Sequence, residues 1–190
     1  MARTQLTPLN EMTPEQRSAY DEAASGPRGH APAPMIAWLQ NPELARRAQK
    51  LGELIRYQTS LPPRLSEFAI LVVARHWTTH FEWQAHKKEA LKAGIKPEAI
   101  SMIAARRCPE FEDDAQRAVY DISKSMLEAR VIADDLYQTG VRALGEKGLV
   151  ELVAILGYYS LVAMTLNAFE IGLPDSLQPE LLGGPAGDAK

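Results

Sequence analysis

The segment from Leu61 to Gly94 constrains the fold of this chain more than any other part of its sequence. It contains the longest apolar run and three of the four histidines. Apolar side chains lie on nearly every side of the helix expected from about Pro63, so we expect that helix to be central. Two glutamates, Glu67 and Glu82, stand at positions where a helix of a soluble protein would normally bury something. The sequence therefore predicts a central helix with carboxylates in or beside it.

Helix signals occupy most of the chain, and no segment has a convincing strand pattern. Thr13 to Gln16 forms a capping box before a helix that should run to about Ala24, and Asn41 to Glu43 repeats this start signal. Further helices are expected over residues 44–58, from 63, and over 80–93, 97–105, 113–130, 134–144 and 148–171. The expected apolar face of the helix over 44–58 comprises Leu44, Ala48, Leu51, Leu54, Ile55 and Gln58. We predict a single all-α domain over residues 1–190.

Two segments, residues 25–34 and 174–190, are too rich in glycine and proline to be regular. We expect the second to be mobile or to lie on a neighbour. Whether the helix from Pro63 stops at Thr78-Thr79 or continues into the next segment stays open.

A weak internal repeat favours a duplicated helical unit. LSEFAILVVARHW aligns with LVELVAILGYYSL at a spacing of 84 residues, and EQRSAYDE aligns with AQRAVYDI at a spacing of 100 residues. The two spacings differ by 16 residues, which is about the size of an insertion that spans the loop over residues 25–34. The halves would cover about 12–105 and 112–172, and the second half lacks counterparts of Glu82 and His86. Chance similarity between amphipathic helices is the alternative.

Charge and cysteine content exclude several classes of function. The net charge of −3, with no basic run, gives no electrostatic surface for nucleic acid. Cys108 is the only cysteine, which excludes an internal disulfide, a CxxC pair and a cysteine-rich zinc site, and we expect it to be an inert thiol. The N-terminus lacks the apolar core of a signal peptide, and no apolar run approaches the roughly 20 residues of a membrane span. We expect a soluble cytoplasmic protein without a membrane or nucleic-acid partner.

Glu82 and His86 are four residues apart, so they share one helix face and can hydrogen-bond. Thr79 lies one turn before Glu82 on the same side, and Glu67 lies further back on the apolar helix. A buried carboxylate is costly unless it is paired, and its natural partner is a histidine or an arginine. A buried glutamate beside a histidine suits proton transfer near neutral pH. Alternatively, Glu82 and His86 form a surface pair and Glu67 pairs with an arginine, Arg64 or Arg75.

A metal site is a further alternative. His76 and His80 are also four residues apart and could hold a metal ion together with Glu82 or His86. The chain has no HExxH pattern, and in a continuous helix the two histidines would point about 100° away from the Glu82–His86 face.

Several neighbouring side chains have two readings each. Arg75 could bind a substrate carboxylate or pair with a glutamate, and Trp83, next to Glu82, could wall a pocket or pack in the core. The late apolar helix carries Tyr158, Tyr159 and Asn167. We expect these three to be core residues whose polar atoms have hydrogen-bond partners, and the alternative is that they belong to the site.

The pattern Glu67…Thr79-x-x-Glu82-x-x-x-His86 resembles the carboxymuconolactone decarboxylase superfamily, which includes the alkylhydroperoxidase D-like proteins. The resemblance covers roughly residues 44–104, including HKKEALKAGIKPEAI, and LVAMTLNAFEIGLP resembles the later helix of two-copy members. It implies the all-α alkylhydroperoxidase D-like fold and a homo-oligomer with sites near subunit contacts.

The peroxidase branch of this family carries a glutamate followed by C-x-x-C-x-x-x-H. Here Thr79 and Glu82 stand at the two cysteine positions, while the glutamate and histidine correspond to Glu67 and His86. Thiol peroxidase chemistry needs a thiolate and a resolving thiol, so the resemblance does not extend to that activity.

The decarboxylase branch carries a motif resembling E-x-x-x-H, which Glu82 and His86 match, and its chemistry needs no cofactor. The resemblance implies His86 as general acid/base, Glu82 orienting it or relaying the proton, and Glu67 as a buried relay. Thr79, Trp83 and Arg75 would contact a small cyclic or aromatic-derived carboxylic acid. A redox-inactive binding protein and a metal-dependent enzyme are the alternatives.

Overall fold

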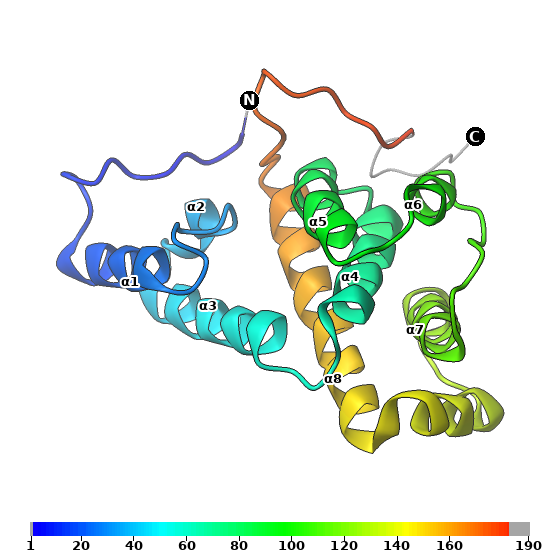
Figure 1. Cartoon of the computed structure of the whole chain (residues 1–190). Coiled ribbons are helices and arrows are strands. Elements are labelled where there is room, and N and C mark those ends of the chain that lie inside the picture. The colour runs from blue at the N-terminus through cyan, green and yellow to red at the C-terminus, as the bar shows by residue number, and fades with distance from the viewer. Residues whose placement is uncertain (1, 183–190) are drawn as a thin grey trace.

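The computed structural model describes residues 2–182, and every regular element in that range is a helix (Figure 1). The central helix is α4 (Pro63–Trp77), which packs against α5, α6, α7 and α8. The other elements are α1 (Pro14–Ser25), α2 (Met35–Trp38), α3 (Pro42–Tyr57), α5 (His80–Lys92), α6 (Pro97–Ala104), α7 (Asp114–Lys124), the π-helical turn η1 (Ser125–Ala129) and α8 (Asp134–Ala168). The all-α prediction is confirmed.

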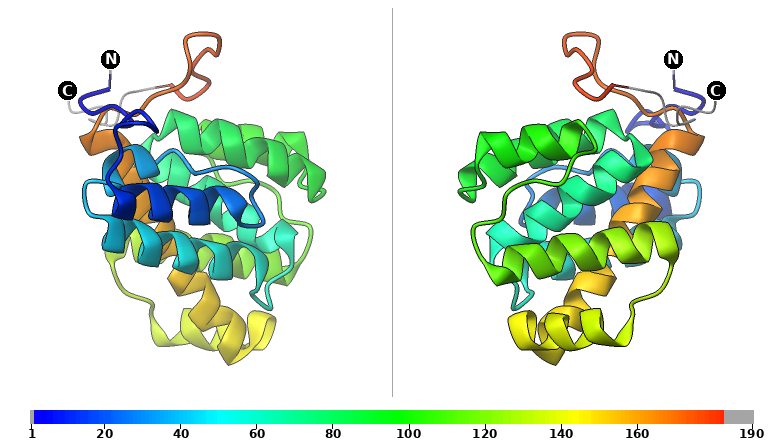
Figure 2. Two further views of the ribbon diagram at one scale, coloured as in Figure 1. Left: turned by 90° about the vertical axis from the view of Figure 1, so that its left-hand side faces the viewer. Right: turned by 90° about the vertical axis from the view of Figure 1, so that its right-hand side faces the viewer.

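The residues of α4 from Leu65 to Arg75 are all buried, as the apolar sequence of this helix predicts. The side views of Figure 2 place α1 and α3 on one side of the α4–α8 pair and α7 on the other. Gly145, with φ of 72°, interrupts the helical backbone of α8 and divides it into two helices, near the boundary that the sequence predicts. Only glycine adopts such a φ without steric cost. α4 and the second part of α8 therefore form the core of the bundle.

The helix starts follow the sequence signals, but the buried face of α3 does not. Thr13 and Gln16 form the reciprocal capping box of α1, and the Asn41 side chain caps α3. In α3 the buried residues are Ala45, Ala48, Gln49, Gly52 and Ile55, whereas Leu44, Leu51 and Leu54 are about half exposed. The prediction of a face made by those leucines was wrong, because the small residues of α3 allow close packing against α1 and α8.

A left-handed turn at Thr78 ends α4, so the helix from Pro63 does not continue into the next segment. Thr78 has φ of 51° and ψ of 49°, and the Thr79 N–H donates to the Ala74 carbonyl, which closes α4. α5 begins at His80 and packs back along α4. As a result, residues early in α4 face residues in the middle of α5.

The two ends of the described range lie at the same end of the molecule in Figures 1 and 2. Arg3 pairs with Glu170 at 2.7 Å. Glu180 accepts hydrogen bonds from Trp83 and Gln84 and pairs with Lys87, all on α5. The predicted irregular tail is therefore docked on α5 as far as residue 182, and residues 183–190 lie outside the described range.

Among the described helices, α8 alone is long and apolar enough to cross a membrane, and 56% of its most apolar window is buried inside the fold. More than half of that window is thus covered by other parts of the fold, and Gly145 interrupts the helical backbone. Duplicated halves stay a prediction, although α1, α3 and α4 in the first half match α7 and the two parts of α8 in order.

A close contact between α3 and α8 gives a test of this packing. A Cβ added to Gly52 would lie 2.1 Å from the Tyr158 hydroxyl, whereas one added to Gly157 would meet nothing within 4 Å. The Tyr158 ring is held between Trp38 and Tyr159, so it cannot swing away. We expect Gly52→Ala to lower the free energy of unfolding by about 1–3 kcal/mol in urea denaturation, as overpacking does.

Gly157→Ala is the matched control, and it should raise the free energy of unfolding by up to about 1 kcal/mol through helix propensity. Equal effects of the two substitutions would contradict the described packing of Tyr158 on α3.

Candidate active site

A pocket of about 450 Å³ lies between α5, α8 and the irregular segment that precedes α3. Its floor carries Glu82 and His86 from α5 and Tyr158 and Tyr159 from α8, and Arg56 comes from α3. Apolar walls are supplied by Ile36, Phe81, Ala85, Val162 and Leu166, and the roof by Arg28, His30, Ala31, Pro32, Ala33 and Pro34. An apolar cavity with a few convergent polar groups is the usual form of a small-molecule site.

The structure pairs His86 with Glu67. His86 Nδ1 donates to Glu67 Oε2 at 2.6 Å, and both side chains are only 8% exposed. The hairpin at Thr78 makes this contact possible, since it brings α5 back along α4. With Nδ1 donating to the carboxylate, Nε2 of a neutral His86 is the nitrogen with a free lone pair. Glu67 therefore sets the orientation and tautomer of the imidazole.

Glu82 stands in a different environment from Glu67. Both of its carboxyl oxygens are buried and lack a hydrogen bond of good geometry among residues 2–182, although the Thr79 hydroxyl lies close enough to lower the pKa of this carboxyl slightly. Burial raises the pKa of the Glu82 carboxyl well above its ordinary value, because the ionised form would lose its hydration. Burial therefore favours the protonated, neutral form of Glu82. The direct Glu82–His86 hydrogen bond considered from the sequence is not formed, since His86 is held by Glu67.

Tyr159 adds a second buried polar atom without a partner among the described residues, its hydroxyl oxygen. Its ring packs edge-on against His86, with ring centroids 4.9 Å apart. Burial raises the pKa of Tyr159 well above its ordinary value and the pKa of Tyr158 to about 12, so both phenols stay protonated. Buried polar atoms without partners are rare in native proteins and mark places where a ligand or water belongs.

Arg56 and the roof were missed from the sequence. Arg56 Nε lies 3.9 Å from Glu67 Oε1, on the side of that carboxylate away from His86. In the sequence, Arg56 is a basic residue near the end of an amphipathic helix. Basic residues at such positions are common on protein surfaces, so the sequence did not mark Arg56 as part of a site. The roof lies in a segment rich in glycine and proline, and no pattern there indicated a ligand site.

The three residues expected to bind substrate lie elsewhere. The Thr79 hydroxyl donates to the Ala74 carbonyl near the start of α5, and Trp83 donates to Glu180 in the tail. Arg75 donates to the carbonyls of Ala104 and Leu182. Each side chain is buried and none of the three lines the 450 Å³ pocket, but the Thr79 hydroxyl lies close enough to Glu82 to affect the pKa of its carboxyl.

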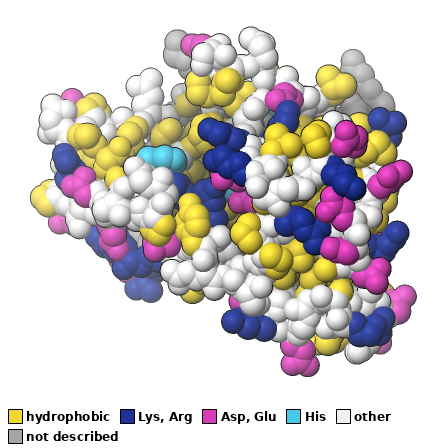
Figure 3. Space-filling view, viewed as in Figure 1, with side chains coloured by type: hydrophobic (Ala, Val, Ile, Leu, Met, Phe, Trp, Pro, Cys, Tyr) yellow, Lys and Arg dark blue, Asp and Glu magenta, His cyan; other side chains and the backbone are white. Residues whose placement is uncertain are grey.

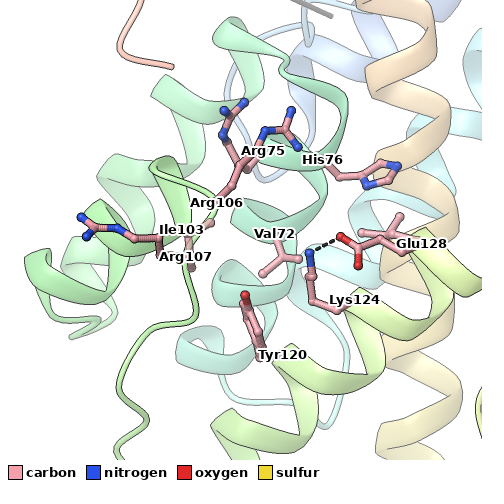
Figure 4. Close-up of a pocket in the computed structure, with 10 residues that line it drawn as sticks. Val72, Arg75, His76, Ile103, Arg106, Arg107, Tyr120, Lys124 and Glu128 are labelled. Carbon is pink, nitrogen blue, oxygen red and sulfur yellow. Dashed lines mark hydrogen bonds and ion pairs between the residues drawn. The ribbon is translucent and has the colours of Figure 1, made fainter. Parts of the chain in front are cut away.

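Figure 4 shows Arg75 and His76 at a separate small cavity between α4, α6 and α7, close to the ion pair of Lys124 and Glu128. That cavity measures about 30 Å³, which holds one or two water molecules and no substrate.

The residues of the metal alternative are divided between different places. His76 lies at the small cavity of Figure 4, and His80 borders another pocket near Asn167 and the tail. The break at Thr78 separates these two histidines onto different helices. Within residues 2–182, no group of three or more His, Cys, Asp or Glu side chains has the arrangement of a metal site. Cys108 is exposed and does not line the candidate pocket.

The environment of Glu82 predicts a specific pH dependence of stability. Its folded-state pKa lies above the ordinary value of about 4.5, so the folded state retains a proton that the unfolded state has lost. Stability therefore falls as the pH rises above 4.5, by up to about 1.4 kcal/mol per pH unit until the folded-state pKa is reached. We expect Glu82→Gln to remove this component, so that its stability relative to wild type increases from pH 5.5 to pH 8 in urea denaturation.

Glu89→Gln, also on α5, is the control. The Lys92 hydrogen bond lowers the pKa of Glu89, so this carboxyl is ionised in both states throughout that pH range. Its difference from wild type should stay constant, and a constant difference for Glu82→Gln as well would contradict a protonated Glu82.

Comparison with known proteins supports the fold and the family. Residues 42–124 match the model of the carboxymuconolactone decarboxylase family. Comparison with curated protein sequences finds no match. Three solved structures of similar fold are an AhpD-like protein of unknown function from Agrobacterium tumefaciens, the alkylhydroperoxidase AhpD core of an uncharacterised peroxidase-related protein from Ralstonia eutropha, and a variant of the debrominase Bmp8 bound to 2,3,4-tribromopyrrole.

The Ralstonia protein has a TM-score of 0.74 and 13% identity over 92% of this chain and 93% of its own. The Agrobacterium protein has a TM-score of 0.64 and 16% identity over 72% of this chain and 94% of its own. The debrominase has a TM-score of 0.69 and 13% identity over 98% of this chain and 94% of its own. At these identities the likeness shows the fold alone, which is the predicted alkylhydroperoxidase D-like fold. Residues 42–124 thus resemble the carboxymuconolactone decarboxylase family, and the chain has a single cysteine and therefore no CxxC pair.

Proposed function

We propose that the protein is a cofactor-free acid/base enzyme that decarboxylates, or moves a proton within, a small cyclic or aromatic-derived carboxylic acid. One observation carries this proposal: Glu82, whose burial favours the protonated carboxyl, and a Glu67-oriented His86 line the same apolar pocket. Two titratable groups whose environments differ so strongly suit the roles of acid and base. The family match supports a related enzyme or binding protein, and the reaction itself is our proposal.

In the proposed decarboxylation, the bond between the ring carbon and the carboxylate carbon breaks and CO₂ leaves. The electron pair of that bond enters the unsaturated ring as a dienolate. Glu82 gives its proton to the ring carbon, and the Tyr159 hydroxyl is close enough to the same pocket to donate to the enolate oxygen. The Glu82 carboxylate then takes a proton from solvent, so the reaction consumes one proton overall. For proton transfer without loss of CO₂, His86 Nε2 removes the proton from carbon.

Thiol chemistry is not part of this proposal. The only cysteine is Cys108, which is exposed and lies outside the pocket, and Thr79 and Glu82 stand where the peroxidase branch has cysteines. Threonine and glutamate supply neither a thiolate nor a resolving thiol.

The test is turnover of carboxymuconolactone, followed by CO₂ release and by deuterium incorporation at carbon in D₂O. We expect His86→Ala and Glu82→Gln each to lower kcat at least about 100-fold, because each removes one proton-transfer group. His76→Ala is the control, since His76 lies at the separate small cavity, and it should leave kcat unchanged. Equal loss in all three variants would indicate a folding defect. If the wild-type protein binds the lactone without turnover, the chain is a binding protein and the enzyme proposal fails.

We also propose that the protein forms a homo-oligomer through α8. Val150, Val153, Leu161 and Met164 form an exposed apolar stripe on this helix. An exposed stripe of this kind on a symmetric pair of subunits is self-complementary.

Light scattering should give a mass of at least twice 21.0 kDa for the wild-type protein. We expect Leu161→Glu to reduce the mass to that of the monomer, because a charge would be buried in the interface. Val131→Glu, at an exposed position after η1, is the control and should leave the mass unchanged. A monomeric wild-type protein would overturn this assignment.

A further inference from the structure

The roof of the candidate pocket lies outside the part of the chain that matches the family. We call residues 25–34 the strap, and the family match begins only at residue 42. The strap lies between α1 and α2, and it is anchored by Met35 and Trp38, which are nearly fully buried. The Trp38 indole also donates to Thr165 on α8 at 3.0 Å. The strap is therefore a fixed part of the pocket wall that the family motif does not determine.

Arg28 on the strap has no hydrogen bond or ion pair within residues 2–182. Glu53 borders the neighbouring small cavity together with Arg28 but is not paired with it. Arg56 Nε lies 3.9 Å from Glu67 Oε1 and its guanidinium lies over the Tyr57 ring, 5.3 Å from the centroid, while its terminal N–H groups make no hydrogen bond in the described range. Both arginines line the pocket, and both are close enough to Tyr158 to influence its pKa.

The negative charges around the pocket are already neutralised. Glu67 is paired with His86 and Arg56, and Glu89 is paired with Lys92 at 2.9 Å. Burial disfavours a negative charge on Glu82. Arg28 is therefore not paired with any described carboxylate at the rim, and Glu53 borders the neighbouring cavity with it. On the face in Figure 3, a histidine lies beside basic side chains near the middle of the molecule.

We propose that Arg28 is the residue that recognises the substrate carboxylate, with the terminal N–H groups of Arg56 as its second anchor. This inference rests on the proposed function, and it names the part of the site that selects for charge. A guanidinium offers two parallel N–H donors, which match the two oxygens of a carboxylate. The apolar walls and the tyrosine rings would hold the ring of a monocyclic carboxylate below the strap. A neutral compound of the same shape would leave Arg28 unpaired.

The experiment measures binding, so it is independent of turnover. Benzoate and benzamide have the same ring and nearly the same shape, and only benzoate carries a charge. We expect wild-type protein to bind benzoate at least about tenfold more tightly than benzamide in isothermal titration calorimetry. Arg28→Gln should bring the benzoate affinity down to that of benzamide. Because Arg28 has no partner in the described range, this substitution should leave the thermal stability unchanged.

Arg17→Gln is the matched control, since Arg17 is an exposed arginine of α1 paired with Asp21, and the preference for benzoate should persist in this variant. Equal binding of the two probes to wild-type protein, no binding of either, or an unchanged preference in Arg28→Gln would each overturn the proposal. His86→Ala should retain the preference for benzoate. A protein without turnover that still prefers benzoate would refute the proposed reaction and keep the role of Arg28.

Discussion

The hydrogen bond between Glu67 and His86 is the interaction on which the site depends. A carboxylate on the most buried helix of the fold needs a partner, because an isolated charge there would lose its hydration without compensation. The partner comes from α5, and the turn at Thr78 delivers it. The same contact joins the two helices and fixes the imidazole in the pocket. One pair of side chains therefore both stabilises the packing of α5 on α4 and holds the His86 imidazole in the pocket.

The two glutamates of the motif illustrate how position decides chemistry. Glu67 has a histidine and an arginine within reach, whereas both oxygens of Glu82 lack a hydrogen bond of good geometry in the described range. They have the same functional group, but Glu82 lines the pocket whereas Glu67 contacts it only through His86. The first is suited to hold a charge and the second to hold a proton. An enzyme that transfers protons at carbon needs both kinds of group, and the fold provides them from adjacent helices.

The sequence predicted the helices well because their boundaries depend on local signals, such as the capping box at Thr13 and the glycine at Gly145. It also singled out Glu67, Glu82 and His86, which the structure brings close together, although it did not predict which carboxylate His86 would contact. That choice depends on the reversal of the chain at Thr78, and a threonine in the left-handed region carries no clear sequence signal. The substrate roles of Thr79, Trp83 and Arg75 could not be judged without knowing which side of α5 faces the pocket. Arg56 and the strap reach the site only through tertiary packing.

The strap contains Pro27, Pro32 and Pro34, and its far end is fixed by buried Met35 and Trp38. Proline restricts the backbone before a ligand arrives, so little conformational entropy is lost when the pocket fills. Such a roof acts as a preset template rather than as a gate that closes. Because it lies outside the segment that carries Glu67, Glu82 and His86, its residues can be exchanged without disturbing the proton-transfer groups. Related chains could acquire new substrates by changing this one segment while the reaction stays the same.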